Sequence, residues 1–445
     1  MVQAVYFTRK TMKILIISYY FPPINSIASL RPYSWAKYWS QMGHEVTVLT
    51  ASEAKKSNDL NIDCSLFNMI RITNPLKNLM TPSITEGSIQ INCQSQSKPT
   101  FLRKFKTFLQ SRGIMSTARM PDFNDVVIAK SVDAISSAQF DFIISTAGPY
   151  TEHLIAHKIM KKQKQAFWIA DYRDLWTQNH IFKGLFPFTW IEEYLEKKIN
   201  HSADYITTVS QPLADQISHK YTIDNVAVIE NGFDTDDTSA IAKEPYWSDN
   251  KVRLVYTGVI YRGKQDPSPL LEAIQIIDQS EYSHLLQKLE VIFVGGAKGD
   301  LHEFISKYGV DTWVKDHGFV SRDDALRMQR DAHGLIFLEF EAPGVDGILT
   351  GKLFEYLDSG TEILGIGVTD KNTPGKLIAE SEQGRNFGTD SQKIATHLKN
   401  LLEKQSKPVI TKNTECLKKY SRQYLAEKLI SIVTNSQTNI GNINA

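Results

Sequence analysis

Short apolar segments alternate with helical segments along most of this chain of 445 residues. Lys13–Ser18 has a continuous apolar centre, a helical pattern extends from about Ser29 to Met42, and Glu45–Thr50 is apolar again. Continuous apolar runs of this length are typical of strands that are buried on both faces of a parallel sheet. The alternation therefore predicts consecutive βαβ units and an α/β fold.

The same alternation is found twice, before and after a polar stretch at residues 235–250. One compact core does not accommodate such a chain, because domains usually contain about 100 to 200 residues. We expect a first Rossmann-like domain at residues 12–234 and a second at residues 235–415. The later predicted strands are Phe140–Thr146, Ala166–Ala170 and Ala203–Ser210 in the first domain, and Val252–Thr257, Glu290–Val294, Val314–Val320, Gly334–Leu338 and Ile363–Ile366 in the second. Residues 1–11 and 436–445 are predicted to be a disordered extension and a frayed polar tail.

Charge and cysteine content argue against several classes of protein. Lysine plus arginine number 50 against 49 for aspartate plus glutamate, and a net charge of +1 argues against a dedicated nucleic-acid binder. The three cysteines are far apart and odd in number, which predicts neither a disulfide framework nor a metal site and fits a reducing cytoplasm. No run of about 18 apolar residues is present, so we expect a cytoplasmic protein that is soluble or peripheral to a membrane.

Residues 51–122 interrupt the alternation with an irregular excursion that contains one two-sided helical segment. Phe101–Gln110 has phenylalanine and leucine on one side, with Arg103, Lys104 and Lys106 on the flanks and the opposite side. Helices of this kind are typical of contact with an anionic membrane surface. The alternative is a helix that packs on its own domain.

Polar residues follow the predicted strands of the first domain. Ligands of open parallel sheets bind beyond the carboxyl ends of the strands, so Asp171, Arg173 and Asp174 are predicted to face a binding cleft. His153 and Arg31, on two helices of the same domain, are further candidates. The alternative for the first group is a salt-bridged turn in which Arg173 pairs with a carboxylate. The alternatives for His153 and Arg31 are a solvated histidine and a surface helix residue.

A glycine and two cations follow the first predicted strand of the second domain. Gly258 allows the backbone to approach a ligand closely, and Arg262 and Lys264 can neutralise two or more negative charges. A loop with these properties is suited to a pyrophosphate.

Gly351–Gly360 is predicted to be a helix that leads into the last predicted strand. Its apolar residues share one face, and Gly360 is placed to end it. Its N-terminus offers backbone N–H groups and Lys352 where the helix dipole already favours an anion. Glu355 lies one turn later; by itself it is more typical of a solvated surface residue than of a ligand.

The segment Lys352–Leu357, followed by Ser359 and Gly360, resembles the donor-binding helix of retaining nucleotide-sugar glycosyltransferases of family 4. Phe21–Pro23 and Asp171–Trp176 resemble two other segments of that family. The resemblance implies the GT-B fold, in which two Rossmann-like domains with parallel sheets face a cleft and a last helix, here residues 416–435, crosses back to the first domain. The family has a second glutamate eight positions before Glu355, where this chain has Gly347.

The resemblance also implies roles for the candidate residues. The donor would be held by Gly258, Arg262, Lys264, Lys352, Leu353 and Glu355. The acceptor side would be formed by Arg31, His153, Asp171, Arg173 and Asp174. In the family the glutamate that matches Glu355 binds the ribose hydroxyls, and the loop that matches Gly258–Lys264 binds the diphosphate. Asp171, Lys264 and Glu355 are the expected catalytic residues, with no metal and no cofactor.

The implied activity is transfer of a sugar from a UDP or GDP donor to a glycan or lipid-linked acceptor with retention, in bacterial surface polysaccharide synthesis. A peripheral contact with an anionic membrane is expected, and no contact with nucleic acid. Two alternatives stay open. One is a nucleotide-sugar epimerase with the same fold, and the other is a degenerate, non-catalytic subunit that binds a partner enzyme.

Overall fold

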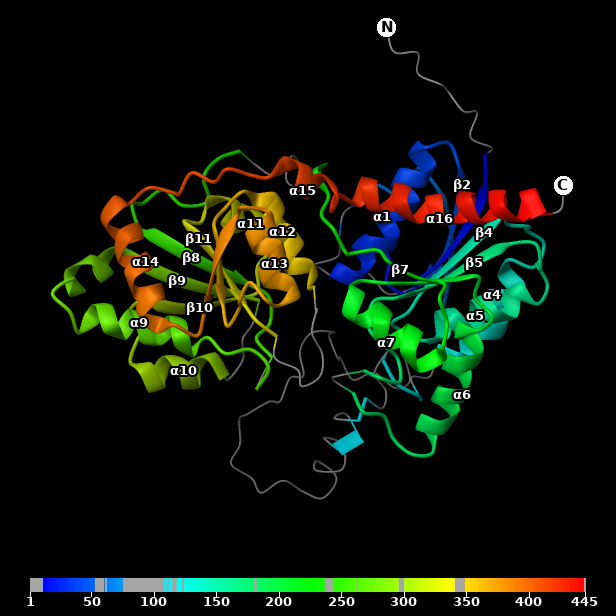
Figure 1. Cartoon of the computed structure of the whole chain (residues 1–445), viewed down its shortest axis with the longest axis horizontal. Coiled ribbons are helices and arrows are strands. Elements are labelled where there is room, and N and C mark those ends of the chain that lie inside the picture. The colour runs from blue at the N-terminus through cyan, green and yellow to red at the C-terminus, as the bar shows by residue number, and fades with distance from the viewer. Residues whose placement is uncertain are drawn as a thin grey trace, which may run out of the picture. The chain divides into compact units, whose positions relative to one another are not determined.

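The computed structural model describes residues 11–52, 60, 62–74, 108–109, 112–113, 118–121, 124–179, 182–236, 243–261, 263–295, 300–340 and 349–443. These residues form two compact units, which are described separately (Figure 1). Unit 1 comprises the chain up to Ile229 and from Ala426 onward, and unit 2 comprises Glu230–Leu425. The cations of the predicted membrane helix, together with Arg262 and Gly347, lie outside the described residues.

The described part of unit 1 contains one seven-stranded parallel sheet in the order β3-β2-β1-β4-β5-β6-β7. Its strands are β1 (Lys13–Ile17), β2 (Glu45–Ala51), β3 (Asn68–Ile72), β4 (Phe142–Thr146), β5 (Phe167–Tyr172), β6 (Tyr205–Thr208) and β7 (Val226–Val228). The excursion predicted at residues 51–122 is therefore partly wrong, because β3 is a regular strand within it. Within β3 only Ile70 and Ile72 are half-buried, and the other three residues are exposed. This edge strand therefore lacks the continuous apolar run from which the other strands are predicted.

Helices cover both faces of the sheet in unit 1. They are α1 (Ile27–Gln41), α4 (Ile128–Ala134), α5 (Thr151–Met160), α6 (Phe188–Asn200), α7 (Gln211–Tyr221), the 3-10 turn η1 (Asn124–Val127) and α16 (Arg422–Ile443), most of which lies in unit 1. The Trp39 indole N–H donates to the Ala426 carbonyl at 2.9 Å, which fixes α16 beside α1 (Figure 1). The tail predicted to fray from residue 436 is helical as far as Ile443.

The described part of unit 2 repeats the same strand order in a six-stranded parallel sheet, β10-β9-β8-β11-β12-β13. Its strands are β8 (Val252–Thr257), β9 (Leu289–Val294), β10 (Val314–Gly318), β11 (Gly334–Leu338), β12 (Ile363–Ile366) and β13 (Gly384–Gly388). Its helices are α9 (Ser268–Asp278), η2 (Ser283–Lys288), α10 (Asp300–Tyr308), α11 (Arg322–Asp331), α12 (Gly351–Ser359), α13 (Thr373–Glu380), α14 (Ser391–Lys404) and α15 (Thr414–Lys418). The sequence pattern does not predict β13, because Gly384–Gly388 has no apolar run.

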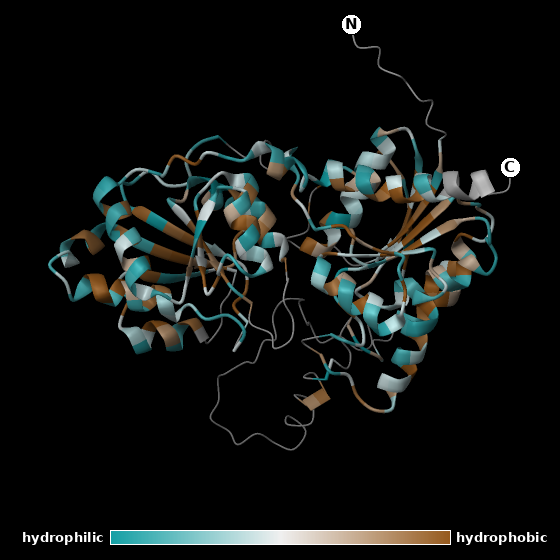
Figure 2. Ribbon diagram, viewed as in Figure 1, coloured by the Kyte–Doolittle hydropathy of each residue, from teal (hydrophilic) through white to brown (hydrophobic). Residues whose placement is uncertain are grey.

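Two hydrophobic layers enclose the sheet of unit 2 (Figure 2). Leu254 and Tyr256 of β8 pack with α9, α10 and α14, whereas Val255 packs on the opposite face with α11, α12 and α13. Alternate side chains of one strand thus enter both layers, as expected for a sheet buried on both faces. In each unit the strand order reverses next to the first strand, and ligands of open α/β sheets bind at the carboxyl ends of strands near such a point.

The boundary between the units falls at residues 229 and 230, whereas the sequence predicts it at 234 and 235. The chain returns from unit 2 to unit 1 between Leu425 and Ala426. Phe233 belongs to unit 2 because its backbone pairs with the segment just before that point. The N–H of Phe233 donates to the Tyr420 carbonyl at 3.0 Å, and its carbonyl accepts from Arg422 at 2.8 Å. A side chain at Gly232 would collide with this pairing, since its Cβ would lie 2.5 Å from the Tyr420 carbonyl oxygen.

Candidate functional site

Bare backbone lines the carboxyl edge of the sheet in unit 2. Gly258 and Gly295 follow β8 and β9, Gly318 ends β10, and their φ angles are +116°, +118° and +75°. Gly258 donates to the Val294 carbonyl at 2.7 Å, and Gly295 donates to the Gly318 carbonyl at 2.8 Å. A Cβ at Gly295 would lie 2.9 Å from the backbone of Gly258. At Gly295 both the positive φ and the close approach exclude a side chain, so glycine is required there.

Lys352, in the first turn of α12, lies against this glycine edge. Its Nζ lies 3.6 Å from the centroid of the Tyr256 ring, and a Cβ at Gly258 would lie 2.9 Å from its Cε. Within the described part of the chain no carboxylate forms an ion pair with it. Burial lowers the pKa of Lys352 to about 7, an effect that the charge of Glu355 only partly offsets. Among the described residues this amino group therefore has an aromatic partner, Tyr256, and no acidic ion-pair partner.

Glu355 lies one turn later on α12 and is held as a carboxylate. Its Oε1 accepts from the Arg322 guanidinium at 2.7 Å, and its side chain is 13% exposed. Burial would raise the pKa of Glu355, but the charge and hydrogen bond of Arg322, followed by the charge of Arg422 and a hydrogen bond from Gln329, hold it below the usual value. Arg322 of α11 is therefore the main cause of the ionised state of Glu355.

The remaining donor-side candidates differ in placement. Lys264 is half-buried on the turn after β8, where its N–H donates to the Tyr261 carbonyl at 3.0 Å. Gln265 anchors this turn, because it accepts from the Tyr261 N–H at 3.2 Å and donates to the Leu338 carbonyl at 3.2 Å. The Leu353 side chain is fully buried in the core and its N–H donates to Thr350. Leu353 therefore supports α12 from beneath rather than presenting a side chain to a ligand.

Asp171, at the carboxyl end of β5, is completely buried. Its carboxylate accepts two hydrogen bonds from Arg31, at 2.7 and 3.2 Å, and one each from Thr146 at 2.7 Å and Thr207 at 2.8 Å. Burial would raise the pKa of Asp171, but Arg31 and the two threonines together hold it below the usual value. Asp171 and Arg31 thus form an internal ion pair that joins α1 to three strands, and Arg31 is not the surface residue of the alternative reading.

Arg173 joins loops instead of forming the salt-bridged turn of the alternative reading. Its guanidinium donates to the carbonyls of Ala28 at 3.0 Å, Ala147 at 2.9 Å and Gly148 at 3.0 Å. The Ala28 carbonyl belongs to the first turn of α1, and the other two belong to the loop after β4. Arg173 therefore carries a positive charge among carbonyl dipoles of these two segments. Asp174, the next candidate along the loop, is exposed.

His153 is buried and uncharged rather than solvated. Its Nδ1 lies 2.8 Å from the Ser145 hydroxyl, and its ring lies 4.6 Å from that of Tyr172. The Trp168 indole N–H donates to the same hydroxyl at 3.0 Å. Burial lowers the pKa of His153 to about 3, and the imidazole is therefore neutral over the physiological range.

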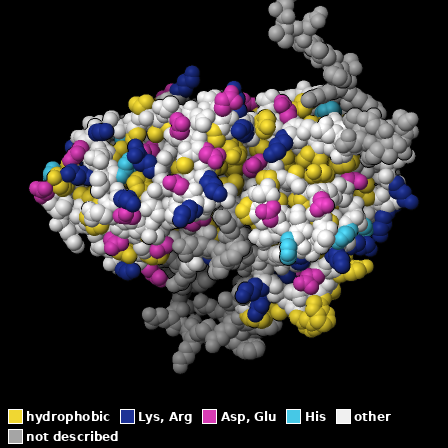
Figure 3. Space-filling model, viewed as in Figure 1, with side chains coloured by type: hydrophobic (Ala, Val, Ile, Leu, Met, Phe, Trp, Pro, Cys, Tyr) yellow, Lys and Arg dark blue, Asp and Glu magenta, His cyan; other side chains and the backbone are white. Residues whose placement is uncertain are grey.

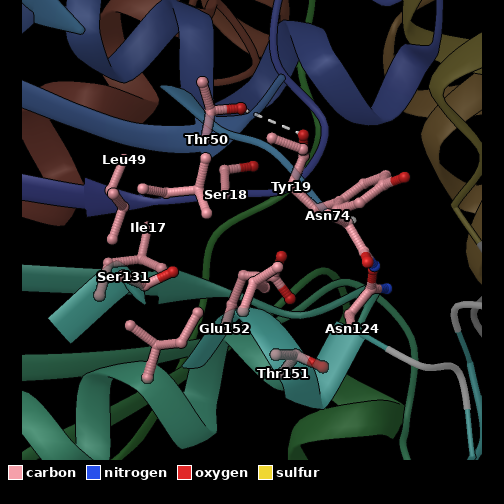
Figure 4. Close-up of a pocket in the computed structure, with 14 residues that line it drawn as sticks. Ile17, Ser18, Tyr19, Leu49, Thr50, Asn74, Asn124, Ser131, Thr151 and Glu152 are labelled. Atoms are coloured by element: carbon pink, nitrogen blue, oxygen red, sulfur yellow. Dashed lines mark hydrogen bonds between the residues drawn. The ribbon is translucent and has the colours of Figure 1, made fainter. Parts of the chain in front are cut away.

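A small cavity of about 40 Å³ lies beyond the carboxyl ends of β1 and β2 (Figure 4). Apolar side chains line it together with hydroxyl groups, two asparagines and one carboxylate, and Thr50 donates to the Tyr19 carbonyl at 3.1 Å (Figure 4). These polar lining residues are Ser18, Thr50, Asn74, Asn124, Ser131, Thr151 and Glu152. Liquid water occupies about 30 Å³ per molecule. The cavity can thus hold about one water molecule, and no sugar-binding role is assigned to it.

No family model matches the chain, and no curated protein matches its sequence. Solved structures match nearly its whole length. Sucrose-phosphate synthase (tll1590) from Thermosynechococcus elongatus has a TM-score of 0.61 at 13% identity, with 96% of this chain and all of that chain covered. A structure described as trehalose-6-phosphate from E. coli bound with UDP-2-fluoro glucose has a TM-score of 0.59 at 12% identity, covering 95% and 98%. A point mutant of S. aureus TarM in complex with fondaparinux, alpha-GlcNAc-glycerol and UDP has a TM-score of 0.57 at 9% identity, covering 95% and 100%.

The chain has the GT-B fold. The predicted α/β architecture of two Rossmann-like units is thereby confirmed, whereas family 4 and retention stay predictions. No helix in the described part of this GT-B chain is long and apolar enough to cross a membrane. Its described residues also contain no group of three or more histidine, cysteine or acidic side chains that could hold a metal.

Sequence reasoning missed three residues of the site in unit 2 of this GT-B chain. Arg322 and Gln329 of α11 contact Glu355, and Tyr256 of β8 supports Lys352. Arg322 precedes Glu355 by 33 positions, so no local pattern joins the two. Ser321, whose hydroxyl accepts from the Asp324 N–H at 3.0 Å and caps α11, was the available signal that a helix begins beside the site.

Proposed function

We propose that the chain is a glycosyltransferase that moves a sugar from a nucleotide-diphosphate donor to a glycan or lipid-linked acceptor. One observation carries the proposal: Lys352, which has no acidic ion-pair partner among the described residues, and the ionised carboxylate of Glu355 lie one turn apart on α12, beside the bare backbone of Gly258. The negative charge of a diphosphate requires a positive group such as that of Lys352. Ribose hydroxyls can donate hydrogen bonds to a carboxylate such as that of Glu355. In addition, two of the solved structures of this fold were determined with UDP or a UDP sugar.

In the proposed reaction the bond between the anomeric carbon and the diphosphate oxygen breaks, and a bond to the acceptor hydroxyl oxygen forms. The acceptor proton leaves to the diphosphate or to solvent, and negative charge develops on the diphosphate. Lys352, Lys264 and the first N–H groups of α12 supply fixed positive charge for that change. We therefore propose a metal-independent reaction, with retention as the family resemblance implies.

The acceptor is proposed to bind unit 1 at the loop after β5. Asp174 is exposed there, and Arg173 offers positive charge at the same edge. Asp171, Arg31 and His153 are proposed to position this loop from beneath, because all three are buried and already hydrogen-bonded. A lipid-linked acceptor in bacterial surface polysaccharide synthesis fits this proposal.

Lys264→Ala is expected to weaken binding of UDP or GDP by roughly 10-fold to 150-fold. The reason is the loss of a charge-assisted contact, which contributes about 1.5 to 3 kcal/mol. Isothermal titration calorimetry measures the change, and Lys393→Ala is the control because that lysine is 75% exposed on α14. Equal affinity of the Lys264 variant and wild type for the diphosphate removes Lys264 from the site.

Glu355→Gln is expected to remove discrimination between normal and 2′,3′-dideoxy nucleotides. The carboxylate can accept both ribose O–H groups, whereas the amide keeps its shape but loses the charge and acceptor capacity. Wild type should bind the dideoxy diphosphate poorly, and the variant should bind both nucleotides with similar, reduced affinity in the same titration. A variant that discriminates as well as wild type shows that Glu355 does not bind the ribose.

A panel of nucleotide sugars with and without glycan acceptors, scored by mass spectrometry, tests the proposed function. A glycosylated product that requires the acceptor is the expected result. An isomerised sugar formed without acceptor would indicate the epimerase instead. Absence of any thermal shift with UDP or GDP would indicate the non-catalytic subunit.

A further inference from the structure

Helix α6 of unit 1 carries a row of exposed aromatic side chains. Phe186, just before the helix, Trp190 and Tyr194 recur every four residues and are 64%, 69% and 65% exposed. The rings of Phe186 and Trp190 meet edge to face with centroids 4.9 Å apart. Ile191, next to the row, is 44% exposed. Residues four apart lie on one side of a helix, so these side chains form one continuous apolar strip.

The opposite side of α6 is fixed to unit 1 by buried polar contacts. Glu192 forms an ion pair with Arg119 at 2.8 Å and accepts from the Trp176 indole at 3.1 Å. Glu196 accepts from the backbone N–H of Thr177 at 3.2 Å. The aromatic row is therefore presented outward by a firmly held helix.

Lysines gather around the aromatic row. Lys197 and Lys198 are exposed in the last turn of α6, and Lys161 is exposed at the end of α5, which packs against α6. Burial lowers the pKa of His157, and the nearby charges of Lys161 and Lys198 lower it further. Both lysines therefore lie near the same histidine. Glu193 is the one exposed carboxylate on α6, whose residues are all described. Figure 3 shows hydrophobic and cationic side chains side by side over the region where Figure 1 places α6.

We propose that this α6 surface, made of Phe186, Trp190, Ile191 and Tyr194 with Lys161, Lys197 and Lys198, binds an anionic lipid bilayer. Tryptophan and tyrosine favour the level of the lipid headgroups, and lysines near an anionic leaflet are attracted to it. Three rings that are about two thirds exposed offer roughly 400 Å², which is half of the roughly 800 Å² per partner of a stable protein interface. The same strip suffices for a bilayer surface, where charge and aromatic anchoring act together. This surface shares no residue with the predicted helix Phe101–Gln110, and its binding does not depend on the proposed glycosyl transfer.

Vesicle sedimentation of the full chain tests the proposal. Vesicles of phosphatidylcholine alone are compared with vesicles that contain about one third phosphatidylglycerol, a source of anionic charge. Wild type should sediment with the anionic vesicles at low salt and be released at 1 M salt, where the screening length falls to about 3 Å. Lys161→Gln, Lys197→Gln and Lys198→Gln together should weaken binding by roughly 5-fold per lysine. Trp190→Ala with Tyr194→Ala should abolish it, together with the lipid-induced blue shift of tryptophan fluorescence.

Phe319→Ala is the matched control, because that ring is 68% exposed in unit 2 and its loss should leave sedimentation unchanged. If the aromatic double variant does not fold, Trp190→Ser alone is measured in its place. Wild type that ignores anionic vesicles overturns the proposal, as does an aromatic variant that binds like wild type. A wild-type dimer that the aromatic variant converts to monomer, without vesicle binding, assigns the surface to a second copy of the chain.

Discussion

Asp171→Ala is expected to lower the free energy of unfolding by about 3 to 5 kcal/mol, because removal of one partner of a buried ion pair leaves the other charge uncompensated. In this chain the uncompensated charge is Arg31, which is 3% exposed. For a unit of this size the loss corresponds to a melting temperature roughly 6 to 20 °C lower. Thermal denaturation followed by circular dichroism measures the change.

Removal of both charges separates a structural role of Asp171 from a catalytic one. Arg31→Met with Asp171→Ala should be less destabilised than Asp171→Ala alone, since apolar replacement of a buried pair is often close to neutral. A single variant with unchanged melting temperature and lost transfer activity would contradict the positioning role. It would restore Asp171 as a residue that acts on substrate.

Lys352→Met is expected to weaken binding of a nucleotide diphosphate by roughly 10-fold to 150-fold, through loss of a charge-assisted contact of about 1.5 to 3 kcal/mol. The same change should stabilise the fold at neutral and acidic pH. Because the folded-state pKa of Lys352 is lowered from 10.5 to about 7, the cost of burying the ammonium group is fully present below pH 7. It diminishes as the pH rises towards 10.5.

The gain in melting temperature of Lys352→Met should therefore be largest near pH 6 and vanish near pH 10. Leu353→Ala is the contrasting variant, since it removes a buried side chain of the same helix and should destabilise at every pH. A Lys352 variant that is less stable than wild type at pH 6 would show that the lysine supports the fold, and its role in anion binding would lose its main support.

Much of the fold is predictable from periodicity because strands buried on both faces require continuous apolar runs. Lys13–Ser18 and Val252–Thr257 have such runs and form β1 and β8. The edge strands β3 and β13 have none, since an edge position buries fewer side chains. Their register comes from backbone pairing with β2 and β12, which the residues themselves do not show.

The candidate site divides in the same way. Gly258, Lys352 and Glu355 are predictable, because a glycine turn and a helix N-terminus leave local signals. The partners that decide their chemistry are not local: Arg322 contacts Glu355 across 33 positions, and Arg31 contacts Asp171 across 140. In unit 1 the sequence predicts that Asp171 faces a binding cleft, because it is a charged residue at the end of a strand. Its contact with Arg31 makes it part of an internal ion pair instead.

Calorimetric titration of UDP and GDP into wild type and Lys352→Met at pH 6.5 and 8.5 tests the donor site most directly. If the free site holds a lysine with a pKa of about 7 and a bound diphosphate requires the ammonium form, wild-type affinity should fall by up to roughly tenfold per pH unit above that value. The variant should bind weakly and equally at both pH values. Wild-type affinity that does not change with pH, or a variant that binds as tightly as wild type, would contradict the assignment of α12 as the donor-binding helix.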